Sequence, residues 1–96
     1  MRFEIKNKTA YYGSGSGASE DGQPIVFIHG AGFDHTVWVL PARYFARKGF
    51  RVVALDLPGH GRSEGPALTS VEAMSDWIVE VSETLALQDL VVLGHS

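Results

Sequence analysis

The sequence contains no cysteine, and its 96 residues carry a net charge of only −3. Without cysteine there are no disulfides and no thiolate metal sites. Basic residues form no cluster along the chain, which argues against a nucleic-acid partner. The longest apolar runs, such as residues 25–28, are far too short to cross a bilayer. No apolar segment typical of a signal peptide follows the charged N-terminal residues. We therefore expect a cytoplasmic protein without membrane or nucleic-acid partners.

The apolar residues are concentrated in short runs that are typical of buried strands. Hydrophobic residues make up 45% of the chain and charged residues 20%, which suits a globular protein. Three continuous aliphatic runs occupy residues 24–28, 51–55 and 90–93. Because their apolar residues do not alternate with polar ones, these runs predict parallel strands covered on both faces.

An antiparallel hairpin is expected before these runs. Phe3 and Ile5 alternate with charged residues, which indicates a half-buried strand. Asn7 and Lys8 are the expected turn, and residues 10–13 the expected returning strand. A loop rich in glycine and serine then covers residues 13–22.

Two helices are expected between the aliphatic runs. The first covers roughly residues 36–48, with a short turn before Pro41 and the main helix from Pro41 to a left-handed stop at Gly49. The second begins near Thr69 and Glu72, which have the spacing of a capping box. Its apolar stripe at steps of three and four predicts packing on a sheet and comprises Val71, Met74, Ile78, Val81 and Leu85.

Together these elements predict an α/β fold, with a mostly parallel sheet, helices on both faces and an opening antiparallel hairpin. The two crossover connections should be right-handed. No internal repeat and no linker divides the chain, so residues 1–96 should belong to one domain.

The last three residues are Gly94-His95-Ser96, and they follow the third aliphatic run directly. They match the first three positions of G-x-S-x-G, in which serine occupies a tight turn between a strand and a helix and presents its hydroxyl above the sheet. The simpler interpretation of the tripeptide alone is a serine that caps the following helix.

Two more motifs follow the other aliphatic runs. In residues 29–32, His-Gly-Ala-Gly, backbone N–H groups can point at a developing oxyanion; the simpler interpretation is a glycine-rich turn that binds no ligand. Residues 56–63 form a tight loop in which Asp56 can accept hydrogen bonds from loop amides. We interpret this second motif as structural rather than catalytic.

HGAGFDHTVW, DLPGHGRSEG and VVLGHS occur in this order, each after one of the three runs. This combination resembles the esterase and lipase-like branch of the α/β-hydrolase family. The resemblance implies that Ser96 is the nucleophile, and that Ala31 provides an oxyanion donor with Gly32 as the second candidate. Serine at the elbow, rather than aspartate, argues against the dehalogenases and epoxide hydrolases of this fold.

The same resemblance implies roles for three residues near that loop. His29 should brace the oxyanion loop, while Phe33 and His35 should line the mouth of the pocket. Phe33 is accordingly our candidate substrate-binding residue.

The catalytic acid and base of the family are missing from these residues. The family order is serine, then aspartate or glutamate, then histidine, and every histidine here precedes Ser96. The third strand would also have an unpaired edge. We therefore expect residues 1–96 to be the N-terminal segment of a single hydrolase domain. The remaining strands, the lid, the acid and the histidine would come from the rest of that domain, on the same or a separate chain.

The expected activity is acyl transfer by a serine hydrolase, most simply a carboxylesterase for small carboxylic esters, with no cofactor and no metal. Lactone hydrolysis, carbon–carbon bond hydrolysis and perhydrolysis use the same front half, and a non-catalytic ligand-binding protein of this fold is the other alternative. A dinucleotide-binding site is disfavoured. Gly30, Gly32 and Asp56 imitate its fingerprint, but His35 stands where the third glycine belongs.

Overall fold

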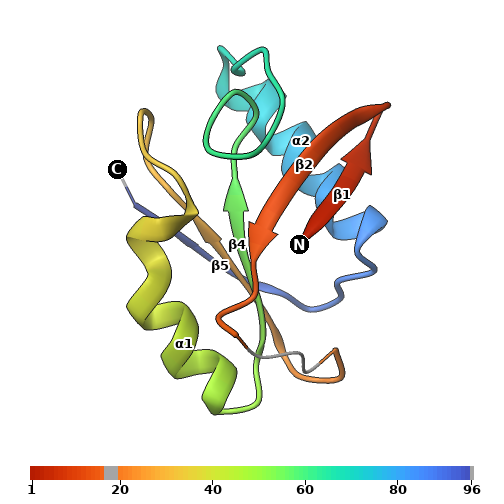
Figure 1. Ribbon diagram of the computed structural model, residues 1–96. Helices are drawn as coiled ribbons and strands as arrows, with labels where there is room; N and C mark the ends of the chain where they lie inside the picture. Colours follow the sequence, from red (N-terminus) through yellow and green to blue (C-terminus); the bar gives the residue numbers. More distant parts are fainter. Residues whose placement is uncertain (17–19, 96) are drawn as a thin grey trace.

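The computed structural model describes residues 1–16 and 20–95. They form a five-stranded sheet in the order β1-β2-β4-β3-β5, with one helix on each face (Figure 1). The strands are β1 (Arg2–Ile5), β2 (Lys8–Gly13), β3 (Pro24–Ile28), β4 (Arg51–Asp56) and β5 (Val91–Gly94). The helices are the 3₁₀ turn η1 (His35–Trp38), α1 (Val39–Arg47) and α2 (Val71–Thr84). The predicted α/β class, opening hairpin and parallel strands are all present.

The hairpin turns one residue earlier than predicted. Lys6 and Asn7 form the turn, with φ angles of 51° and 66°, and Lys8 already pairs with Ile5 across β1 and β2. Two consecutive positive φ angles give a two-residue loop the twist that its flanking strands require. The prediction that Asn7 and Lys8 form the turn is therefore wrong by one position.

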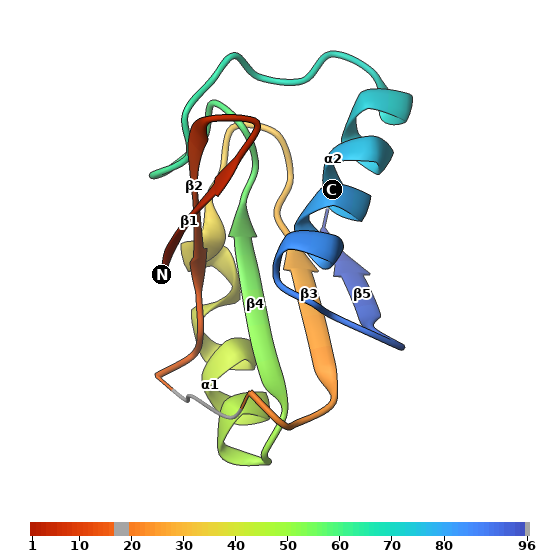
Figure 2. The same cartoon turned by 90° about the vertical axis from the view of Figure 1, so that its right-hand side faces the viewer.

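Strands β3 and β4 are buried on both faces, as their continuous apolar sequences predicted. Val26, Val53 and Leu55 face α2 and pack with its Val81. Their alternating neighbours face α1 and pack with its Ala42; they are Ile25, Phe27, Val52 and Ala54. Figure 2 shows the two helices on opposite sides of these strands. The chain moves from β3 out to β4 and then back past β3 to β5, so two crossovers of the same hand place their helices on opposite faces.

Strand β5 departs from the prediction, because it is not covered. It pairs with β3 alone, at the edge of the sheet, and Val91, Val92 and Leu93 are 45%, 46% and 40% exposed. Neither helix among the described residues is seated over this strand: the apolar residues of α1 and α2 pack over β3 and β4. The apolar residues of β5 are therefore exposed at one edge of the sheet.

Helix α1 begins at Val39, two residues before the predicted start at Pro41. Pro41 is its third residue, where the missing N–H costs no intrahelical bond. The predicted short turn is η1, which Asp34 caps by accepting a hydrogen bond from the Thr36 N–H. Gly49, with φ 91°, follows the helix in the expected left-handed conformation.

Helix α2 is capped by Ser70 rather than by Thr69. The Ser70 hydroxyl accepts a hydrogen bond from the Ala73 N–H at 3.0 Å. Three of the five residues in the predicted apolar stripe pack in or against the core, whereas Val71 is 73% exposed and Met74 is 36% exposed. The first turn of α2 extends beyond the core, whereas Trp77, which the stripe omitted, packs against the core with Ile78 and Leu85.

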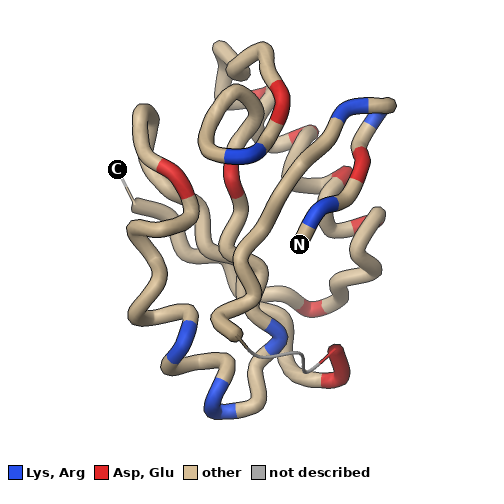
Figure 3. Tube along the Cα trace, viewed as in Figure 1, with Lys and Arg blue, Asp and Glu red and all other residues tan. Residues whose placement is uncertain are grey.

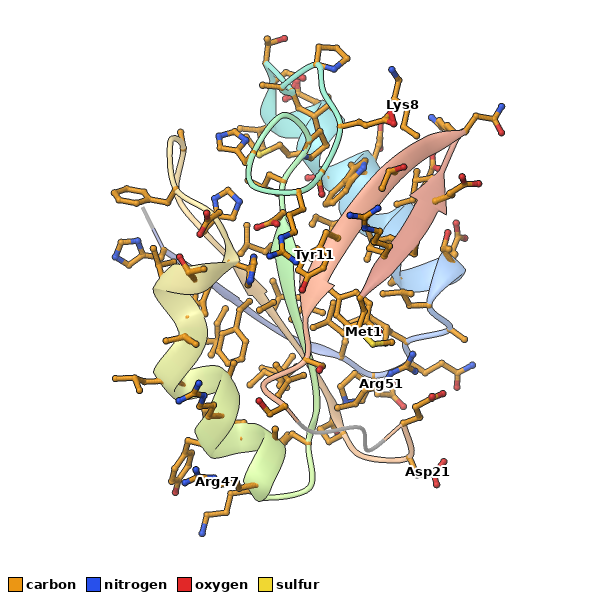
Figure 4. All side chains as sticks on the ribbon, in the orientation of Figure 1. Met1, Lys8, Tyr11, Asp21, Arg47 and Arg51 are labelled. Atoms are coloured by element: carbon orange, nitrogen blue, oxygen red, sulfur yellow. The ribbon has the colours of Figure 1, made fainter. Side chains whose placement is uncertain are left out.

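Charged residues are distributed over both ends of the molecule (Figure 3). Lys8 lies at the hairpin end, where its Nζ donates to the Gly65 carbonyl oxygen, and Arg47 lies at the opposite end of the molecule (Figure 4). Neither helix within residues 1–16 and 20–95 has the length and apolar character to cross a bilayer.

Candidate active site

The carboxyl ends of β3, β4 and β5 meet at one end of the sheet. The three strands are parallel, and Ile28 of β3 lies opposite both Leu55 and Gly94. The loops after β3 and β4 therefore lie side by side in the upper part of Figure 2, at the end of the sheet where β5 also ends. They border a mostly apolar pocket of about 280 Å³, whose lining includes His29, Gly30, Ala31, Leu57, His60, Met74 and His95.

The loop after β3 presents three consecutive amides near this pocket. The Phe33 N–H donates to the Gly30 carbonyl oxygen at 3.1 Å, and the Gly32 N–H donates to Nε2 of His60 at 3.1 Å. The Ala31 N–H has no hydrogen-bond partner within residues 1–16 and 20–95. Of the two predicted oxyanion donors, the Gly32 N–H is therefore hydrogen-bonded, and the Ala31 N–H is not bonded to any described residue.

His29 braces this loop, as predicted. Its ring is 2% exposed; Nε2 accepts a hydrogen bond from the Leu57 N–H at 3.0 Å, and Nδ1 donates to the Gly30 carbonyl oxygen at 2.8 Å. Because one partner is a donor and the other an acceptor, the ring is a neutral imidazole with its proton on Nδ1. Both nitrogens are occupied, so His29 has no free nitrogen to act as a base.

His60 is a site residue that the sequence analysis did not identify. Its Nδ1 lies 3.0 Å from the Pro58 carbonyl oxygen, and its ring centroid lies 5.0 Å from that of His29. It thus joins the loop after β4 to Gly32, which is 28 residues away in sequence. No local pattern predicts this contact, because it depends on two loop conformations at once.

Asp56 organises the loop after β4, as predicted. Its carboxylate also binds His35, which we expected at the mouth of the pocket. The Asp56 side chain is fully buried. Oδ2 accepts from the Arg62 N–H at 2.9 Å, while Oδ1 accepts from the backbone N–H and the ring Nδ1 of His35. The prediction that His35 lines the mouth of the pocket is therefore wrong, because this buried carboxylate holds its ring.

Ser63 fixes the same loop to the hairpin, and this contact was also missed. Its hydroxyl donates to the Asp56 carbonyl oxygen at 2.7 Å and accepts from the Tyr11 N–H at 3.0 Å. The Arg62 guanidinium lies 5.0 Å from the centroid of the Tyr11 ring, which Figure 4 labels. These contacts anchor one wall of the pocket to β2.

Phe33 and His95 lie together beside the pocket. Phe33 is 53% exposed, and its ring meets the His95 ring edge-on at 6.4 Å, while Trp38 meets His95 edge-on at 6.1 Å. The His95 N–H donates to the Ile28 carbonyl oxygen at 3.0 Å. Ser96, the predicted nucleophile, lies outside the described residues.

Three side chains of types that can bind a metal ion lie next to the site. They are Asp34, His35 and Asp56, and their possible ligand atoms lie within 4.8 Å of one another. Both Asp56 oxygens and the His35 ring are already hydrogen-bonded. Asp34 accepts hydrogen bonds from the hydroxyl and then from the backbone N–H of Thr36, and these two bonds, the hydroxyl bond most of all, hold the pKa of its carboxyl below the ordinary 3.8. We assign no metal to this cluster, because the hydrogen bonds already account for its geometry.

A second pocket, of about 310 Å³, lies between the hairpin, residues 58–68 and α2. A hydrogen bond and ion pair between Lys6 and Glu80, at 2.8 Å, borders it. Its Ser63 hydroxyl is occupied by the two bonds to Asp56 and Tyr11. The candidate site therefore remains the pocket at the carboxyl ends of the strands.

The chain is similar in sequence to known proteins. Residues 25–96 match the sequence model of the alpha/beta hydrolase family. The (E)-2-((N-methylformamido)methylene)succinate hydrolase of Acinetobacter baylyi is 36% identical over 91 residues, which are 94% of this chain and 33% of that protein. A non-heme chloroperoxidase of Streptomyces lividans is 35% identical over 77 residues, which are 79% of this chain and 28% of that protein.

Solved structures show the same arrangement. A membrane phospholipase A superposes with a TM-score of 0.89 at 30% identity, covering 100% of this chain and 31% of that one. An esterase from Exiguobacterium antarcticum superposes with a TM-score of 0.81 at 27% identity, covering 96% and 33%. The chain thus spans about a third of the length of the proteins that it matches.

Proposed function

The chain belongs to the α/β-hydrolase family, and from that premise we propose that it supplies the nucleophile and one oxyanion donor of a serine hydrolase. The proposed nucleophile is Ser96, the proposed donor is the Ala31 N–H, and the proposed reaction is acyl transfer from small carboxylic esters to water. The relatives named as a hydrolase and an esterase support this class of reaction.

The observation that carries the proposal is the Ala31 N–H, which has no hydrogen-bond partner in the part of the chain that the structure describes. It lies in a loop whose next two amides, those of Gly32 and Phe33, are hydrogen-bonded, and Ala31 itself lines the pocket beside the ends of the strands. A donor fixed before the reaction stabilises the oxyanion without reorganisation, and removing one such donor typically costs about 10²–10³ in turnover. Strand β5 ends at the same end of the sheet, and its last residue, Gly94, precedes Ser96 by two positions in the sequence.

In the proposed mechanism, the Ser96 oxygen attacks the ester carbonyl carbon while a histidine takes the hydroxyl proton. The carbonyl π electrons move to the oxygen, and the resulting oxyanion accepts a hydrogen bond from the Ala31 N–H. When the intermediate collapses, the carbon–oxygen bond breaks and the alcohol leaves with the proton from the histidine. Water, deprotonated by the same histidine, then attacks the acyl carbon. The bond from this carbon to the serine oxygen breaks, the serine oxygen takes the proton back from the histidine, and the acid is released.

The acid and the histidine of this mechanism are proposed to come from the remainder of the domain. Among the described residues, the rings of His29, His35 and His60 are each held by hydrogen bonds to their own or a neighbouring loop. The uncovered edge of β5 is the surface that the rest of the sheet would join. The partner that completes the site is therefore the remaining segment of the same hydrolase domain.

Perhydrolysis is a second candidate reaction, because one relative is named as a non-heme chloroperoxidase. The acyl-serine intermediate would be the same, but hydrogen peroxide would replace water in the second step and release a peracid. Comparing ester consumption with peracid formation in the presence of peroxide separates the two reactions. A ligand-binding protein without turnover would give neither product.

The decisive experiment treats the full-length protein with a fluorophosphonate probe and measures its intact mass under denaturing conditions. One covalent adduct is expected in the wild type and none in Ser96→Ala. Ser75→Ala, which removes an exposed serine of α2, is the matched control and should label fully. An adduct that persists in Ser96→Ala would overturn the assignment of the nucleophile. Turnover of a short-chain ester by the labelled wild type would contradict catalysis by this serine.

A further inference from the structure

His60 links the loops after β3 and β4 through both of its ring nitrogens. The Pro58 carbonyl oxygen, 3.0 Å from Nδ1, can only accept a hydrogen bond, and the Gly32 N–H, 3.1 Å from Nε2, can only donate one. The ring therefore carries its proton on Nδ1 and has a lone pair on Nε2. Only this neutral tautomer satisfies both neighbours.

The Gly32 end of this link lies where packing provides little support. Gly32 has a φ angle of 85°, and a Cβ built on it would meet no atom within 4 Å. The backbone is thus in a left-handed conformation, with open space where a side chain would pack. The His60 bond and the turn bond from Phe33 to Gly30 are the contacts that hold this part of the loop.

The Gly32 amide, which His60 holds, is next in the chain to the Ala31 amide. The peptide unit that carries the Gly32 N–H also contains the Ala31 carbonyl, so a fixed Gly32 N–H restricts the ψ angle of Ala31 and the direction of its neighbouring N–H. A displacement of about 1 Å at a reacting centre can cost roughly 10²-fold in rate. The position of the Gly32 amide therefore affects how accurately the Ala31 N–H points at the oxyanion.

We propose that His60 is a positioning residue of the hydrolase, and that its Nε2 lone pair holds the Gly32 amide so that the Ala31 N–H points at the oxyanion. This role rests on the proposed function, since it needs an oxyanion at that place. His60 itself exchanges no proton with the substrate. It acts through the backbone of the neighbouring loop.

Glutamine and asparagine separate the two bonds that His60 makes. In His60→Gln, an oxygen at the ε position can accept from the Gly32 N–H in place of Nε2. In His60→Asn, the shorter amide can donate to the Pro58 carbonyl oxygen but does not reach Gly32. The two variants have the same functional group, so they form a matched pair that differs in the bond under test.

The test measures kcat and KM of the full-length protein with p-nitrophenyl acetate, together with hydrogen exchange of the Gly32 amide by NMR. His60→Gln should retain kcat within about threefold of the wild type. His60→Asn should lose about tenfold in kcat, with KM changed by less than about twofold, because the affected interaction forms in the transition state. The Gly32 amide should exchange about tenfold faster in His60→Asn than in His60→Gln.

Equal kcat values in the two folded variants, with a wild type that is active and labels at Ser96, would overturn the positioning role and leave the proposed function intact. A wild type that neither labels nor hydrolyses the ester would overturn both. If His60→Asn does not fold, His60→Gln decides alone: near-normal kcat and slow Gly32 exchange support the role, whereas a folded variant with low kcat or a fast-exchanging Gly32 amide contradicts it.

Discussion

Oδ1 of Asp56 accepts two hydrogen bonds from His35, one from the backbone N–H at 2.7 Å and one from the ring Nδ1 at 2.9 Å. This pair joins the end of β4 to the start of η1. Because Oδ2 also accepts from the Arg62 N–H, one buried carboxylate fixes the loops on both sides of the candidate site. The donors it satisfies would otherwise be left without partners in a poorly hydrated region.

Replacing Asp56 should therefore destabilise the protein strongly. Asp56→Ala removes the acceptor for three donors, and we expect a loss of about 3–5 kcal/mol in the free energy of unfolding. Asp56→Asn keeps the shape and one acceptor oxygen, so its loss should be smaller, about 1–3 kcal/mol. Urea denaturation of the full-length variants measures both values. A loss below about 1 kcal/mol for Asp56→Ala would show that water replaces the carboxylate at this position.

The start of α2 gives a sharper comparison between neighbouring residues. The Ser70 hydroxyl caps the Ala73 N–H, while Thr69 is exposed and makes no capping bond. Ser70→Ala should cost about 1 kcal/mol of unfolding free energy, and Thr69→Ala should change it by less than about 0.5 kcal/mol. Thermal unfolding followed by circular dichroism distinguishes the two. The reverse order would restore the capping box of Thr69 and Glu72 that the sequence predicted.

The elements with strong local patterns could be predicted from sequence. The continuous runs that became β3 and β4, and the stop at Gly49, depend on neighbouring residues only. The sequence alone could not predict whether Thr69 or Ser70 caps α2. Both residues can cap a helix, and the preceding loop determines where the helix begins. Val71 shows the same limit: its spacing fits the stripe, but the sheet does not extend far enough to cover it.

In the candidate site too, the sequence predicted some features and not others. The motifs that follow β3, β4 and β5 predicted which loops meet, and His29 braces its loop as expected. The ring of His35 could not be placed, because its partner Asp56 is 21 residues away and buried. The bond between Gly32 and His60 also depends on two irregular loops folding against each other, and no periodic pattern encodes that.

Gly61 should tolerate no side chain, because its neighbour is the Asp56 carboxylate. A Cβ built on Gly61 collides with that group, and its φ angle of 51° already disfavours other residues. Gly61→Ala should therefore cost about 2–4 kcal/mol, the sum of overpacking and backbone strain. Gly49→Ala is the control, since Gly49 also has a positive φ but open space around it, and it should cost about 1 kcal/mol. Equal urea midpoints for the two variants would contradict a collision at Asp56.

Asp34 should make the stability of the protein depend on acid pH. Its carboxylate accepts hydrogen bonds from the N–H and hydroxyl of Thr36, which lower its pKa below the ordinary 3.8. A carboxyl group with a lower pKa in the folded state contributes stability above its unfolded pKa, and this contribution is lost as the pH falls through the folded pKa. The Tm difference between the wild type and Asp34→Ala should thus be constant from about pH 7 to pH 5 and should shrink below about pH 4.

Thermal melts of the full-length protein between pH 7 and pH 2.5 measure this difference. Thr36→Val is the matched variant: it removes the hydroxyl donor but keeps the N–H bond, so it should show part of the same loss at neutral pH. Because Asp34 is only half-buried, added salt should reduce the effect. A Tm difference that stays constant down to pH 2.5 would mean that Asp34 stabilises η1 through its shape, and that the charge of its carboxylate contributes nothing.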